Sequence, residues 1–106
     1  MNEFGLKPEI FDQLLSLFAA IPEVEKVYVY GSRARGDFRD TSDIDLVYES
    51  SQNIDGKLFV ALQDLPTALK FDFINTKAVA NDDFRRNIDR DKKLIYAKNH
   101  PSTKRY

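Results

Sequence analysis

Residues 26–48 have the sequence KVYVYGSRARGDFRDTSDIDLVY, and this stretch decides the fold of the chain. Valine alternates with tyrosine over residues 27–30, a composition that favours a strand covered on both faces. Gly31 ends this strand and begins a polar stretch, for which we expect a short helical turn and then a loop. Strand-forming residues return over residues 43–48 and predict a second strand.

The flanking segments predict the remaining elements. Their apolar residues either recur at helical spacing or gather in short strand-like runs. In chain order they predict a helix at 8–21, a helix at 58–65, a strand at 70–74, a helix that Asn81 caps and that runs through residues 84 and 88, and a strand at 94–96. One helix thus precedes the opening stretch, and helices alternate with strands after it. This order is typical of an α/β or α+β domain built on a single sheet.

Length and composition exclude several classes of protein. The 106 residues have room for one domain, 1–106, with residues 98–106 expected as a frayed tail. A chain without cysteine has no disulfide, thiolate metal site or thiol nucleophile. The 16 basic and 17 acidic residues are interspersed, which argues against direct nucleic-acid binding. The longest nearly apolar run, residues 14–21, is too short to span a membrane, so we expect a cytoplasmic protein with no membrane partner.

Three aspartates are the candidate metal ligands. Side chains at i and i+2 of a strand leave the same face roughly 6.5 Å apart, so Asp43 and Asp45 project together. Asp72 lies in the middle of the predicted strand at 70–74, where composition favours an apolar residue. Three converging carboxylates match the two-metal arrangement of phosphoryl or nucleotidyl transfer, with magnesium as the metal. The pair Asp43 and Asp45 by itself is also compatible with a solvated strand end.

The turn after the first strand is a candidate phosphate cradle. Gly31 and Ser32 directly follow a buried strand, where main-chain N–H groups can face an anion. The segment is neither a Walker A sequence nor a Gly-x-Gly-x-x-Gly fingerprint, so those nucleotide-binding folds are not supported. We interpret Tyr28 and Tyr30, within the strand itself, as sheet packing.

The compound pattern resembles the polymerase-beta-like nucleotidyltransferase superfamily, and in particular its minimal nucleotidyltransferases. The matching features are Gly31-Ser32, a gap of ten residues, the segment 43–46 (Asp-Ile-Asp-Leu) and a later strand aspartate, Asp72. This resemblance implies a mixed sheet with helices packed on one side. It also implies two magnesium ions and ATP as the co-substrate.

The resemblance assigns roles to the candidate residues. Asp43 and Asp45 would ligate both metals, and Asp72 would complete the ion that binds the acceptor hydroxyl, either as ligand only or also as the base. Gly31 would let the main chain approach the triphosphate, to which Ser32 would donate its hydroxyl. Arg33 could also reach the phosphates, although a loop arginine is by default solvated.

The resemblance also implies a partner protein. Minimal nucleotidyltransferases are commonly paired with a separate helical HEPN-domain protein, an RNase toxin, for which they serve as antitoxin by attaching AMP from ATP to a tyrosine. We therefore expect a hetero-oligomer. Two alternatives stay open: a split-subunit enzyme that modifies a small molecule, and a non-catalytic antitoxin that acts by occlusion.

Overall fold

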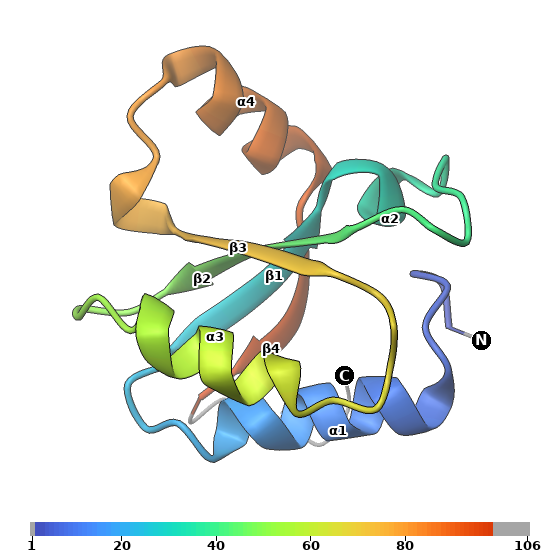
Figure 1. The fold of residues 1–106 in the computed structure, drawn as a ribbon. Coiled ribbons are helices and arrows are strands. Elements are labelled where there is room, and N and C mark those ends of the chain that lie inside the picture. Colours follow the sequence, from blue (N-terminus) through green and yellow to red (C-terminus); the bar gives the residue numbers. More distant parts are fainter. Residues whose placement is uncertain (1, 99–106) are drawn as a thin grey trace.

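The structure is a computed structural model that describes residues 2–98, arranged around one mixed sheet (Figure 1). In chain order its elements are α1 (Pro8–Ala19), β1 (Lys26–Tyr30), α2 (Gly31–Arg35), β2 (Ile44–Glu49), α3 (Asp55–Gln63), β3 (Phe71–Asn75), the 3-10 helix η1 (Thr76–Ala78), α4 (Asp82–Asp91) and β4 (Lys93–Ala97). Each helix and strand expected from the sequence is present, and η1 is an addition. The predicted tail lies outside the described residues except for Lys98.

The strands within residues 2–98 lie in the order β3-β2-β1-β4. β1 pairs antiparallel with β2 and with β4, whereas β2 and β3 run parallel. Parallel neighbours need a crossover, which α3 supplies. The end of β1 consequently lies beside the beginning of β2, which in turn lies beside the beginning of β3. The turn at Gly31 is therefore next to the strand that carries Asp45 and one strand away from the strand that carries Asp72.

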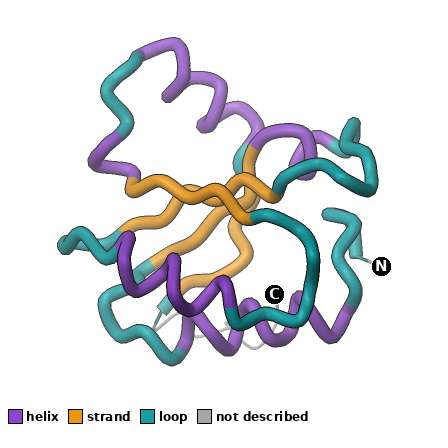
Figure 2. Tube along the Cα trace, in the orientation of Figure 1, coloured by secondary structure: helices purple, strands orange, loops and turns teal. Residues whose placement is uncertain are grey.

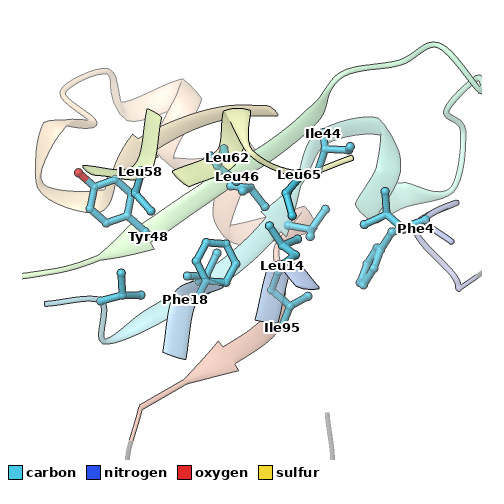
Figure 3. Close-up of a cluster of buried hydrophobic side chains, with 14 of the residues drawn as sticks. Phe4, Leu14, Phe18, Ile44, Leu46, Tyr48, Leu58, Leu62, Leu65 and Ile95 are labelled. Atoms are coloured by element: carbon cyan, nitrogen blue, oxygen red, sulfur yellow. The ribbon is translucent and has the colours of Figure 1, made fainter. Parts of the chain in front are cut away.

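The main core lies between the sheet and the two helices α1 and α3 (Figures 1 and 2). Alternate strand residues point to this side, because successive side chains of a strand leave opposite faces. Figure 3 shows the resulting cluster, in which α1 contributes Leu14 and Phe18 and α3 contributes Leu58 and Leu62. Burial of these apolar side chains is what orders the sheet, at about 25 cal/mol for each Å² removed from water.

The opposite face of the sheet is covered in part by α4 (Figure 1). A smaller cluster of Val47, Val79 and Ile88 fixes this helix against β2. Asn81 caps it, since the Asn81 side-chain oxygen accepts a hydrogen bond of 2.9 Å from the Phe84 N–H, as the sequence predicts. The expected mixed α+β fold is confirmed: α1 and α3 lie on one side of the sheet as expected, and α4 adds a partial second layer.

Across residues 2–98, no helix has both the length and the apolar character that a membrane crossing requires.

Candidate active site

Asp45 and Asp72 face each other across the parallel pair of strands. Asp45 of β2 is in register with Asp72 of β3 on one side and with Tyr30 of β1 on the other. Residues in register on neighbouring strands share a face of the sheet, with strands about 4.8 Å apart. The three side chains therefore form a row across the sheet, on the face that α4 partly covers.

Asp43 lies just before β2, which begins at Ile44, and its side chain is exposed. Burial raises the pKa of the Asp45 carboxyl, and the negative charges of Asp72 and Asp43 raise it further, while Arg35 opposes the shift. The three aspartates are thus electrostatic neighbours. They do not form a ready metal cage, since no group of three or more acidic or histidine side chains within residues 2–98 is arranged to hold an ion. Like charges keep apart unless a cation lies between them.

Gly31 abuts the Asp45 carboxylate. Its φ is +72°, a left-handed conformation that glycine adopts without strain. A Cβ atom at this position would lie 2.5 Å from the Oδ2 atom of Asp45, far inside contact distance. The turn and the row of acidic side chains are therefore one continuous site, and Ser32 follows as the second residue of α2.

Arg33 does not present its side chain to this site in the structure. The side chain is 1% exposed, and its guanidinium donates hydrogen bonds to main-chain carbonyls, including those of Phe4 and Ser42. Burial lowers the Arg33 pKa, an effect that the charges of Asp40 and Asp43 oppose. The phosphate contact expected from the sequence would require these hydrogen bonds to break, and it remains a prediction.

Tyr30 packs against the cluster of Val47, Val79 and Ile88, as the sequence predicts, and it also lies beside Asp45 in the row across the sheet. Burial raises the pKa of its hydroxyl to about 12, and the charges of Asp45 and Asp72 contribute to the shift. The hydroxyl therefore stays protonated at neutral pH and is available as a hydrogen-bond donor. The position of Tyr30 directly before Gly31 is the sequence signal that could have placed Tyr30 near the site. The alignment of Tyr30 with Asp45, however, depends on strand register.

Phe84 of α4 is the second residue that sequence reasoning missed. Its ring meets the Tyr30 ring edge-on, with 5.9 Å between centroids. A hydrogen bond of 3.1 Å from Arg35 to Asp91 ties α2 to the end of α4. The helix therefore forms one wall of the site, and nothing in the local sequence pattern links residue 84 to residue 30.

A model of the family described as polymerase beta, nucleotidyltransferase, matches residues 12–101. The chain belongs to this nucleotidyltransferase family. The match spans both the Gly31 turn and the strands that carry Asp45 and Asp72. A comparison with curated proteins found no match.

Solved structures share the fold of this nucleotidyltransferase domain. A Sulfolobus solfataricus protein with a provisional assignment as a nucleotidyltransferase is 23% identical, with a TM-score of 0.54, over 85% of this chain and 79% of its own. A toxin–antitoxin with AMP-PNP is 18% identical, with a TM-score of 0.67, over 84% and 74%. A mutant of the toxin–antitoxin MntA–HpeT is 15% identical, with a TM-score of 0.66, over 89% and 77%. At these identities the likeness is one of fold.

Proposed function

We propose that this chain is a magnesium-dependent nucleotidyltransferase that serves as the antitoxin of a toxin–antitoxin pair. In this proposal it transfers AMP from ATP to a tyrosine of a helical HEPN-domain RNase toxin. Membership of the nucleotidyltransferase family supports the reaction class. Fold neighbours described as toxin–antitoxin structures, one of them with AMP-PNP, support the partner and the nucleotide.

The observation that carries the proposal is the juxtaposition of the Gly31 turn with Asp45, itself in register with Asp72. Nucleotidyl transfer needs a cradle for the phosphates beside carboxylates that hold cations. Because Gly31 has no Cβ atom, its main chain lies directly beside the Asp45 carboxylate, with no side chain between them.

The donor set fits magnesium. Asp43, Asp45 and Asp72 offer hard carboxylate oxygens, the ligands that this ion prefers. The raised pKa of Asp45 marks a position where a cation would relieve the repulsion from its two neighbours. When bound, magnesium ions would supply charge stabilisation at the reacting phosphate and lower the pKa of the acceptor hydroxyl.

The chain's own residues would perform the remaining work. Gly31 leaves the main chain free to approach the phosphates, and Ser32 donates its hydroxyl to a phosphate oxygen. Asp72, the exposed member of the aligned pair, would complete the ion that binds the acceptor hydroxyl, either as ligand only or also as the base that takes the proton of this hydroxyl. The oxygen of the acceptor then bonds to the α-phosphorus, and the bond to pyrophosphate breaks.

The decisive experiment uses the protein partner that co-purifies with the tagged chain. With ATP and magnesium, wild type should add AMP to that partner, an increase of about 329 Da per transferred group in intact mass spectrometry. EDTA should abolish the addition. The Asp72→Asn variant should still bind ATP and the partner but leave the mass of the partner unchanged.

Two results would contradict the proposal. One is equal ATP binding by calorimetry with and without EDTA, which would remove the argument for a metal site. The other is an unmodified partner that both wild type and Asp72→Asn still neutralise in cells. The chain would then act by occlusion, without catalysis.

A further inference from the structure

Arg33 makes an unusual set of contacts for a charged residue. Its guanidinium lies inside the domain, and within residues 2–98 it has no ion pair with a carboxylate. It donates instead to five main-chain carbonyls, with N···O distances of 2.9 Å to Phe4, 3.5 Å to Gly5, 3.4 Å to Arg39, 3.2 Å to Asp40, and 2.8 and 3.1 Å to Ser42. One side chain thus joins α2 to the N-terminal segment and to the loop before β2.

The contact with Ser42 bears directly on Asp43. The Ser42 carbonyl belongs to the peptide bond that precedes Asp43, and it accepts from both the Nε and an Nη atom of Arg33. Asp43 itself lies outside the strand ladder, because β2 begins at Ile44. After it, the Ile44 N–H donates to the Lys70 carbonyl at 2.9 Å. The main chain at Asp43 is therefore held on both sides, and Arg33 supplies the hold on the N-terminal side.

The guanidinium has little room to move. It stacks over the ring of Phe38, 4.8 Å from the ring centroid. Gly5 adjoins both groups, since a Cβ atom built there would lie 2.9 Å from an Arg33 nitrogen and 2.7 Å from the Cζ atom of Phe38. A planar group enclosed in this way and bonded along its edges is a rigid link between the helix and the loop.

We infer that Arg33 is a positioning residue, which aligns Asp43 with Asp45 by linking the Gly31-Ser32 helix to the peptide group that precedes Asp43. The inference rests on the proposed function, since it takes Asp43 as a metal ligand. A side chain that orients a metal ligand in this way typically changes metal affinity by about 10- to 100-fold when altered. Lysine keeps the charge but has a single nitrogen, so it loses the two-pronged contact.

The test compares Arg33→Lys with Arg39→Lys, a matched control whose side chain is exposed in the loop that follows α2. Folding is checked by urea unfolding, and Mn²⁺ binding with ATP is measured from the electron paramagnetic resonance of the free ion. Arg33→Lys should fold and bind Mn²⁺ about 10- to 100-fold more weakly than wild type. Its kcat for AMP transfer should fall at low metal concentration and recover at saturating metal. Arg39→Lys should match wild type in each measurement.

Wild-type metal affinity in folded Arg33→Lys would overturn the inference and leave the proposed function intact. Failure of Arg33→Lys to fold would also overturn it, because the role of the residue would then be the stability of the whole domain. If wild type binds no Mn²⁺, or if Asp43→Asn binds Mn²⁺ as tightly as wild type, the metal site of the proposed function fails. The role inferred for Arg33 then fails with it.

Discussion

Replacement of Gly31 by alanine separates backbone strain from damage to the site. The φ of +72° costs a non-glycine residue about 1–2 kcal/mol of folding free energy. In a domain of this size each kcal/mol lowers Tm by about 4–8 °C. The new Cβ atom would also lie 2.5 Å from Asp45 Oδ2, so the carboxylate must move by about 1 Å to reach ordinary contact. A misplacement of that size costs about 10²-fold in rate.

Gly36→Ala is the matched control for this prediction. Gly36 has a φ of +94°, but no atom lies within 4 Å of a Cβ built there. Both variants should lose similar stability in urea unfolding, whereas only Gly31→Ala should lose AMP transfer to the co-purified partner. Equal activity of the two variants at equal folded fraction would refute the assignment of Gly31 and Asp45 to one site. An inactive Gly36→Ala would show that strain alone is responsible.

Two further predictions concern the charge and the hydroxyl of the site. Folding raises the pKa of Asp45 above its ordinary value of 3.8. The protonated carboxyl therefore contributes to folding stability below pH 3.8, and this contribution is lost as the pH rises through the folded-state pKa. In EDTA, Asp45→Asn should therefore raise the free energy of unfolding near neutral pH but not below pH 3.8, as measured by urea unfolding. A lower free energy of unfolding for Asp45→Asn at neutral pH would contradict the direction of the pKa shift. Ser32→Ala removes a hydroxyl without a hydrogen-bond partner among residues 2–98 and should leave Tm unchanged. Calorimetry should show that ATP binding is weakened by about 10- to 150-fold, because one hydrogen bond to a charged group is lost. Unchanged ATP binding would count against a contact between Ser32 and a phosphate.

Sequence patterns predicted the elements because their signals are local. The alternation over residues 27–30 and the helical spacing of Leu58 and Leu62 reflect which side each residue turns toward, so they can be detected without the fold. The cap at Asn81 is equally local. Element ends were less certain, and α3 ends at Gln63, before Leu65, because helix ends depend on capping and on packing with neighbours.

The candidate site could be predicted only in part. The glycine turn and the aspartates at i and i+2 are short-range features, and residue types alone indicate phosphate and magnesium chemistry. Arg33 was a different case, because an arginine is by default exposed. Two carbonyls of the N-terminal segment and three of the loop before β2 had to converge before its guanidinium could be buried.

The sequence by itself determined the order of the elements, the close spacing of Asp43 and Asp45 along the chain, and the glycine that precedes them by a short loop. Tertiary structure decided that Asp72 pairs with Asp45, that Tyr30 completes the row, and that Phe84 packs edge-on against Tyr30. Strand register and helix docking arise from contacts between residues far apart in the chain, and a register slip of one residue would turn Asp72 to the other face. Local periodicity carries no information on which partner residue lies opposite, so that choice belongs to the packing of the whole domain.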